Sequence, residues 1–150
     1  MIRVQREAFD AALEFRQFRE GESGAGGTVM FVGTVRPSNE RGRISAMTLE
    51  HYPSMTEKAL AEIEAEAHRR WPLIKSLIIH RYGRLKPGED IVLALTQSAH
   101  REAAFAACAF LVDFLKTKAP FWKLEEADGR ALWVEAQASD EAAAKRWRKE

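Results

Sequence analysis

The stretch Leu115–Glu125, LKTKAPFWKLE, marks the point where the expected architecture of the chain changes. It places three lysines, one proline and two adjacent aromatic residues within eleven positions. A long apolar helix is expected before it, and Pro120 cannot continue that helix. Strand-like sequence follows. We therefore expect a helix end and a concentration of positive charge at one place, and we take this stretch as the candidate reaction centre.

The helix before this stretch is expected to begin after Ser98, whose side chain is placed to cap it. Small and apolar side chains recur at helical spacing down one face: Ala104, Cys108, Leu111 and Leu115. Three phenylalanines widen that face: Phe105, Phe110 and Phe114. We therefore expect a helix that is buried over most of its surface.

The sequence after the proline predicts a hairpin and a short helix. Two strand-like runs, Trp122–Ala127 and Arg130–Gln137, flank the pair Asp128–Gly129, which favours a two-residue hairpin turn. Ser139 or Asp140 would then cap a short terminal helix.

The N-terminal part begins with a helical pattern over Arg6–Arg19, carried by Phe9, Leu13 and Phe18. Four glycines in residues 21–27 then predict a flexible joint. The β-branched and aromatic run 28–35 predicts a strand buried on both faces, with Gly33 at a bulge or a close approach. The polar run 36–43 that follows predicts a mobile loop.

The middle of the chain continues this alternation of strands and helices. Ile44–His51 predicts a second strand, and Ser54 and Glu57 have the spacing of a capping box before a helix that runs to Trp71. Two further strands are expected, joined through the turn-like sequence KPGED: Ser76–His80 and Ile91–Thr96. This order predicts one α+β domain over residues 1–150, with a mixed, largely antiparallel sheet and two main helices.

The composition bounds the classes of function. With 150 residues, 46% hydrophobic and 30% charged, the chain has the make-up of an ordinary globular protein. No apolar run approaches the ~20 residues of a transmembrane helix, and the N-terminus lacks an apolar block suited to secretion, so no membrane and a cytoplasmic location are expected. A net charge of +1 gives no general attraction to nucleic acid, which is not expected as a partner.

The single cysteine, Cys108, excludes an intrachain disulfide, a CxxC redox pair and a cysteine-based zinc site. Its place on an apolar helix face favours a buried core residue over a catalytic thiol. His51, His68 and His80 lack the spacing of metal ligands, so neither a metal nor another cofactor is predicted. Any sulfur that takes part in the chemistry is expected to be brought in.

Lys116 and Lys123 flank the helix break and are the candidate catalytic residues. One interpretation is structural, because a cation near a helix C-terminus stabilises that helix. The other is chemical: a partly desolvated lysine becomes available as a nucleophile or base, while the second lysine neutralises an anion. Phe121 and Trp122 between them are more often core anchors than a wall that excludes water from a site.

His100 and Arg101 fall in the first turn of the same helix, where free backbone N–H groups attract anions. They form either a surface pair or a phosphate site, the latter if Arg36 or the lysines converge on them. His100 and Lys116 lie at opposite ends of one helix, roughly 24 Å apart at 1.5 Å per residue. If one small substrate uses both, a second chain has to supply one of them.

Four long motifs carry a resemblance to a known family: LEHYPSMTEKALAEIEAEAHRRWP, IIHRYGRLKPGEDIVLALTQSAHREAAF, DFLKTKAPFWKLE and the ending WVEA, SDEAAAKRW. Over residues 28 to 147 the chain resembles the large, catalytic subunit of molybdopterin synthase, the MoaE family. The resemblance implies an α/β-hammerhead-like fold. It also implies a sulfurtransferase that adds two sulfurs to cyclic pyranopterin monophosphate to form the dithiolene of molybdopterin.

The resemblance implies partners as well. In the family the sulfur arrives as a thiocarboxylate on the C-terminal Gly-Gly tail of a small ubiquitin-like subunit, which fits the expectation of imported sulfur. Large subunits pair into a homodimer whose active sites draw residues from both chains, and two small subunits complete a heterotetramer.

The family's essential lysines fall on Lys116 and Lys123, and its phosphate contacts fall on Arg36, His100 and Arg101. The full set of substrate-binding residues that the resemblance implies is Thr34, Val35, Arg36, His100, Arg101, Lys116, Lys123, Leu124 and Glu125. At two of these positions, Thr34 and Leu124, a basic residue is common in the family.

Two other functions compete with this one. A non-catalytic adaptor would bind the tail of a ubiquitin-like protein in the same basic pocket, and its binding would survive loss of Lys116 without any product. An enzyme that binds a phosphate ester and has no link to sulfur is the third interpretation.

Overall fold

The computed structural model of the chain describes residues 1–39, 42–134 and 138–148. The elements in these ranges are β1 Ile2–Gln5, α1 Ala11–Arg19, β2 Gly27–Thr34, β3 Ser38–Asn39, β4 Gly42–Arg43, β5 Ala46–His51, α2 Pro53–Arg70, β6 Leu73–Arg81, β7 Gly83–Leu85, β8 Asp90–Ser98, α3 Arg101–Thr117, β9 Phe121–Ala127, β10 Arg130–Val134 and α4 Ala138–Lys145. The predicted α+β class is confirmed. No helix in the described ranges is long and apolar enough to cross a membrane.

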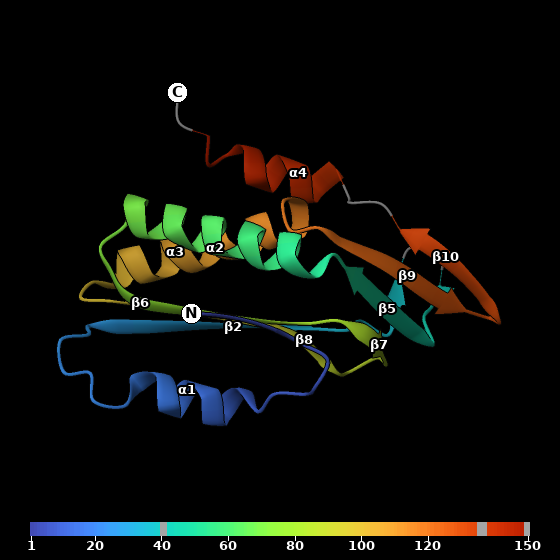
Figure 1. Cartoon of the computed structure of the whole chain (residues 1–150), viewed down its shortest axis with the longest axis horizontal. Helices are drawn as coiled ribbons and strands as arrows, with labels where there is room; N and C mark the ends of the chain where they lie inside the picture. The colour runs from blue at the N-terminus through green and yellow to red at the C-terminus, as the bar shows by residue number, and fades with distance from the viewer. Residues whose placement is uncertain (40–41, 135–137, 149–150) are drawn as a thin grey trace.

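A four-stranded sheet in the order β1-β6-β8-β2 forms the centre of the molecule. β1 runs parallel to β6, and the other pairs are antiparallel. Figure 1 shows α1 on one face of this sheet and α2 and α3 on the other. Side chains of β6 alternate between the two cores, because Ile78 packs among the α2 and α3 side chains while Leu77 and Ile79 pack with Phe18 of α1.

A second four-stranded sheet, in the order β10-β9-β5-β7, is fully antiparallel and projects from one end of the first (Figure 1). A small core of its own joins it to the rest of the molecule: Val35, Met47, Leu49 and Leu85, with Tyr82, Ile91 and Phe121 packed against them. The single sheet expected from the sequence is therefore two sheets, with the short ribbon β3-β4 beside them.

Two predicted helix caps are wrong. α2 begins at Pro53, with Tyr52 at the N-cap and no side-chain cap bond, so Ser54 lies inside the helix. Proline suits the first turn because its fixed φ is already helical and no N–H is needed there. Ser98 is the last residue of β8, and its Oγ donates to the carbonyl of Pro72 over 2.9 Å, while His100 takes the N-cap position of α3.

The N-terminal helix is shorter than the predicted range 6–19. Asp10 caps α1 by accepting a bond from the Leu13 N–H over 3.1 Å, and the residues before it include the unforeseen strand β1. Phe18 is buried, whereas Leu13 is 38% exposed, so the predicted apolar face is correct only in part.

The strand at 28–35 is confirmed as β2, but it is not buried on both faces, since it lies at a sheet edge and Met30 is 43% exposed. Gly33 is a close-approach point as predicted: a Cβ there would lie 2.6 Å from Cγ1 of Val92, and the strand register shifts between Gly33 and Thr34. The run 36–43, predicted as a loop, contains the ribbon β3-β4, with residues 40–41 outside the described part.

The apolar face of α3 is buried as predicted, but Phe105 is 63% exposed and does not widen it. The C-terminal hairpin is confirmed, and Asp128 and Gly129 both have positive φ, at 49° and 73°, as a two-residue turn with matching twist requires. The predicted strand to residue 137 extends past the described part, in which β10 ends at Val134. α4 begins at Ala138, so both predicted cap residues, Ser139 and Asp140, lie within it.

Candidate functional site

Within Leu115–Glu125 a helix ends and a strand begins, as the sequence predicts. Lys116 lies exposed in the last turn of α3, and Lys118 ends the helix with its N–H bonded to the Phe114 carbonyl over 2.8 Å. Pro120 follows, and β9 begins at Phe121. One lysine therefore sits at the end of a buried helix, and the next candidate, Lys123, sits inside a strand.

Lys123 lies on β9 between β5 and β10, opposite Leu49 and Val134. Its Nζ is 3.4 Å from Oε1 of Glu125, and the two side chains are 34% and 6% exposed. The second oxygen of Glu125 accepts a hydrogen bond from Nδ2 of Asn39 on β3. A buried carboxylate thus joins a lysine of the second sheet to the ribbon.

The two faces of β9 carry different side chains. Lys123 and Glu125 share a face with their cross-strand partners Leu49 and Met47, both in the small core. Leu124 points to the other face, like Trp122, because successive strand residues alternate. Of the residues predicted on this strand, the structure brings Lys123 and Glu125 together and places the Leu124 side chain apart from them.

The two aromatic residues of the stretch have different surroundings. Phe121 stacks on the buried ring of His80, with centroids 3.8 Å apart and 16° between the planes. Trp122 is 40% exposed and packs against Tyr52 in an edge-to-face arrangement, with ring centroids 4.4 Å apart. Phe121 is therefore a core anchor, as the sequence favours, whereas Trp122 lies at the surface.

Burial lowers the pKa of His80 from 6.5 to about 4, against the smaller opposing effect of its hydrogen bond to the Arg81 backbone. The Nδ1 of His80 donates to the carbonyl of Arg81 over 2.9 Å, as a neutral imidazole allows. The first residue of β9, Phe121, therefore packs against a neutral imidazole.

Thr34, Val35 and Arg36 follow one another at the end of β2. Thr34 pairs with Asp90 at the start of β8, and the N–H of the buried Val35 donates to the Glu89 carbonyl over 2.9 Å. Figure 1 shows α3 and β2 running in the same direction along the sheet, so the end of β2 lies toward the end of α3 that carries the lysines. Arg36 is exposed there.

His100 and Arg101 lie at the opposite end of α3, beside the start of β2. Gly27 pairs with Ser98, and the N–H of Gly26 donates to the Ser98 carbonyl over 2.9 Å. Because α3 spans Arg101–Thr117, the structure confirms that one chain holds this pair roughly 24 Å from Lys116. The predicted site residues therefore form two groups, one at each end of the helix.

Cys108 is a buried core residue as predicted, with 4% of its surface exposed. Burial raises the pKa of its thiol to about 11. A thiolate nucleophile is disfavoured at neutral pH under these conditions. In the described part of the chain, no three His, Cys, Asp or Glu side chains come together as metal ligands would.

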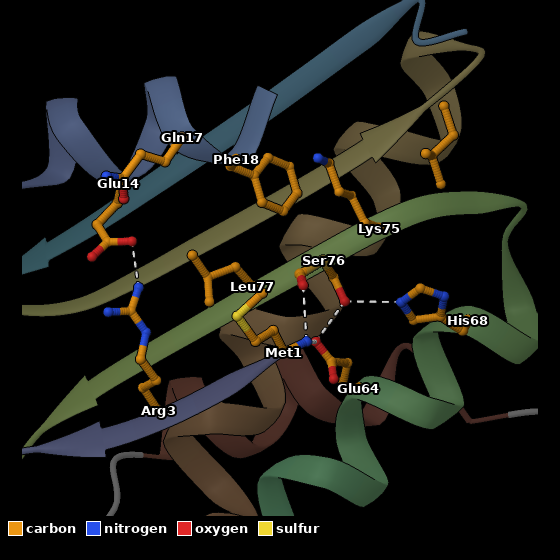
Figure 2. A pocket seen from close by; sticks show the side chains of 11 residues that line it. Met1, Arg3, Glu14, Gln17, Phe18, Glu64, His68, Lys75, Ser76 and Leu77 are labelled. Atoms are coloured by element: carbon orange, nitrogen blue, oxygen red, sulfur yellow. Dashed lines mark hydrogen bonds and ion pairs between the residues drawn. The ribbon is translucent and has the colours of Figure 1, made fainter. Parts of the chain in front are cut away.

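A pocket of about 620 Å³ lies away from all of these residues, between α1, β1, β6 and α2 (Figure 2). Two ion pairs lie on its lining, since the Met1 amine lies 2.6 Å from Glu64 and Arg3 pairs with Glu14, while the Lys75 ammonium lies over the Phe18 ring. Ser76 donates to Glu64 over 2.6 Å, so its hydroxyl proton does not point to the neighbouring His68. These contacts do not make a nucleophile and base pair.

The family model described as MoaE protein matches residues 4–118. The chain belongs to the MoaE family. The molybdopterin synthase catalytic subunit of Pseudomonas aeruginosa is 53% identical over 146 residues, which cover 97% of each chain. Among solved structures, the molybdopterin biosynthesis MoaE protein of Burkholderia ambifaria is 48% identical with a TM-score of 0.85, covering 100% of this chain and 99% of the other.

A more distant solved structure shares the fold. A chain from the protein–protein complex of subunits 1 and 2 of molybdopterin-converting factor from Helicobacter pylori has a TM-score of 0.74 at 17% identity, covering 89% of this chain and 90% of that one. The fold therefore persists where most residues differ.

The sequence did not predict that Asn39 lies beside Glu125 and Lys123. It stands in a polar stretch that reads as a loop, 86 positions from Glu125. Local spacing carries no signal for such a contact, and only the pairing of β9 with β5 and the closure of the ribbon bring the two side chains together.

Proposed function

We propose that this chain is the catalytic subunit of a molybdopterin synthase, which transfers sulfur to cyclic pyranopterin monophosphate to form the dithiolene of molybdopterin. The observation that carries the proposal is the 53% identity, over 97% of the chain, to a relative of that name. The two lysines at the junction of α3 and β9 supply the cationic groups that such a reaction needs.

The sulfur comes from outside the chain in this proposal. Cys108 is buried with a raised pKa, which supports a donor on another protein. That donor is the thiocarboxylate at the Gly-Gly tail of a small ubiquitin-like subunit, and the Helicobacter pylori complex of two subunits is a parallel. We place the assembly in the cytoplasm, as a homodimer of large subunits within a heterotetramer.

Each candidate residue has a role that its position supports. Lys116, exposed at the helix end, acts on the pterin side chain by proton transfer or as a covalent group. Lys123 holds the tail carboxylate or the oxyanion that develops on it. Arg36 of one chain, with His100 and Arg101 of a second copy, holds the phosphate so that the reacting carbons meet the thiocarboxylate.

The Lys116→Ala variant tests the proposal. We expect a loss of at least about 100-fold in dithiolene formation, because general acid–base groups contribute about that much or more. The assay uses the thiocarboxylated small subunit and cyclic pyranopterin monophosphate, with Lys118→Ala as the matched control on the same helix end.

Near-normal turnover by Lys116→Ala would remove Lys116 from the mechanism. If the wild-type chain binds the tail but forms no product, and binding survives in Lys116→Ala, the chain is an adaptor instead. If it binds a phosphate ester but not the tail of a small subunit, the proposed sulfur transfer is wrong and the chain is an enzyme that binds a phosphate ester.

A further inference from the structure

We propose that Asn39 and Glu125 are positioning residues that hold the Lys123 ammonium and the Arg36-bearing segment together on one face of the second sheet. The resemblance implies that Glu125 contacts substrate, whereas its burial and its contacts with Lys123 and Asn39 assign it to the lysine and to the ribbon. The catalytic consequence rests on the proposed function, but the contact itself does not.

Glu125 is the centre of this arrangement. Its side chain is 6% exposed, and its cross-strand neighbours are Met47 on β5 and Leu132 on β10. A carboxylate among apolar side chains costs free energy unless charged or hydrogen-bonding partners satisfy it. Lys123, with its Nζ at 3.4 Å, and Asn39, through Nδ2, are two such partners.

Asn39 ties the ribbon to this carboxylate. It stands three positions after Arg36 and pairs with Gly42 across the ribbon. Both ends of the segment are anchored by buried residues, because Val35 bonds to Glu89 and the Ile44 N–H donates to the Pro37 carbonyl over 2.9 Å. The Asn39 side chain adds a third attachment, made to β9 itself.

The two attachments act on two different site residues. A lysine side chain has a flexible four-carbon stem, so an ion pair at its end selects one position of the ammonium. Fastening Asn39 to the same carboxylate fixes the segment that bears Arg36 relative to that ammonium. Glu125 thereby sets the distance and orientation of Lys123, which holds an anion, relative to Arg36, which holds the phosphate. The positions of both residues depend on this one buried side chain.

The first experiment measures the contact without any enzymatic assay. Reductive methylation followed by peptide mass spectrometry reports how fast the Lys123 amine reacts, with the exposed Lys118 as internal reference. In Glu125→Gln we expect the Lys123 rate to rise about fivefold, since the ion pair with the carboxylate is lost. In Asn39→Ala we expect a smaller rise, because the ion pair with Glu125 remains and only the hydrogen bond from the Asn39 amide to the carboxylate is lost.

The chain offers matched controls for both variants. Glu126 follows Glu125 on the opposite face of β9 and pairs with Arg84 at 3.0 Å, so Glu126→Gln removes an equivalent charge elsewhere. Ser38 precedes Asn39 on the ribbon and is exposed. Glu126→Gln and Ser38→Ala are expected to leave the Lys123 rate unchanged, and an unchanged rate in Glu125→Gln as well would overturn the proposal.

The second experiment separates a positioning role from general destabilisation. Dithiolene formation is measured for Asn39→Ala, with thermal unfolding as a check on folding. A positioning residue predicts a higher KM for the pterin phosphate together with a lower kcat, while the melting temperature stays close to that of Ser38→Ala. Wild-type kinetics in Asn39→Ala would overturn the role, whereas an inactive wild-type chain would overturn the proposed function and leave the methylation result standing.

Discussion

At the scale of single residues, burial determines which titratable groups are available for chemistry. Cys108 is held as a thiol and His80 as a neutral imidazole, because each lies in an apolar environment that disfavours its charged form. Lys116 is exposed instead, and the Lys123 ammonium has a carboxylate beside it. The proposed function therefore uses the lysines of this chain rather than its cysteine or its buried histidine.

His80 makes the stability of the fold depend on pH. Its folded pKa of about 4 lies below the ordinary 6.5, so between these values the unfolded chain takes up a proton that the folded chain does not. The contribution is complete above pH 6.5 and is lost as the pH falls toward 4, by roughly 3 kcal/mol in all. Urea unfolding at pH 7.5 and 4.5 measures it.

The variant His80→Phe isolates this residue from the carboxylates that also titrate in acid. It keeps an aromatic ring against Phe121, and we expect its unfolding free energy to fall less between the two pH values than that of the wild type. His68→Gln, at an exposed histidine, is the control and should match the wild type. Equal pH dependence in wild type and His80→Phe would contradict the assignment.

At the scale of elements, the start of α3 depends on the glycine-rich joint before β2. The expected role of this joint is flexibility, but Gly26 packs against the chain just ahead of the helix. A Cβ on Gly26 would lie 1.9 Å from the carbonyl oxygen of Ala99, a backbone atom that cannot move by itself. The position of His100 and Arg101 therefore depends on a glycine in a distant part of the sequence.

The Gly26→Ala variant is expected to destabilise the chain by about 2 kcal/mol, because the added methyl group forces the backbone apart. Thermal unfolding measures this. Gly24→Ala is the matched control, since its Cβ would meet only the Glu22 side chain, at 3.1 Å, which can turn away. Equal melting temperatures for the two variants would contradict this, because they would show that the backbone around Gly26 accommodates the methyl group without loss of stability.

The elements that sequence predicts well are those whose signal is local. The periodic apolar residues of α2 and α3, the Asp128–Gly129 turn and the close approach at Gly33 are examples. The predicted Ser98 cap is wrong because Ser98 belongs to β8: its hydroxyl donates to a carbonyl 26 positions away and accepts from the N–H of His100, at 3.4 Å, not from an N–H within the first turn of α3. The strand β1 and the division into two sheets depend on pairings between distant segments, which composition does not reveal.

The same distinction holds for the candidate site. Lys116 and Lys123 stand out in one short stretch, and the helix length alone predicts that His100 and Arg101 lie far from Lys116. The contact between Asn39 and Glu125 could not be predicted, because two independent pairings have to form before the side chains meet.

At the scale of the whole molecule, the two groups of site residues lie at opposite ends of α3, and the proposed function needs both. A symmetric dimer resolves this if each site takes Lys116 from one copy and His100 and Arg101 from the other. In this arrangement a chain lacking Lys116 and a chain lacking Arg101 damage the same site of a mixed dimer and leave its other site intact.

Mixing the two inactive variants Lys116→Ala and Arg101→Ala tests this arrangement. After denaturation and joint refolding, about a quarter of all sites are expected to be intact, since half of the dimers are mixed and each holds one undamaged site. Dithiolene formation by the mixture, compared with each variant refolded alone, measures the recovery. Absence of recovery in a preparation that contains mixed dimers would place the whole site within one chain.

The length of α3 then has a consequence for how this chain tolerates insertions. Each residue added to an α-helix turns its two ends by about 100° relative to each other and separates them by 1.5 Å. A single insertion between Arg101 and Thr117 would therefore rotate the lysine end out of phase with the His100 end, even if the helix itself stayed intact. Exposed surface loops absorb length changes without this coupling, so the number of residues in α3 is itself constrained.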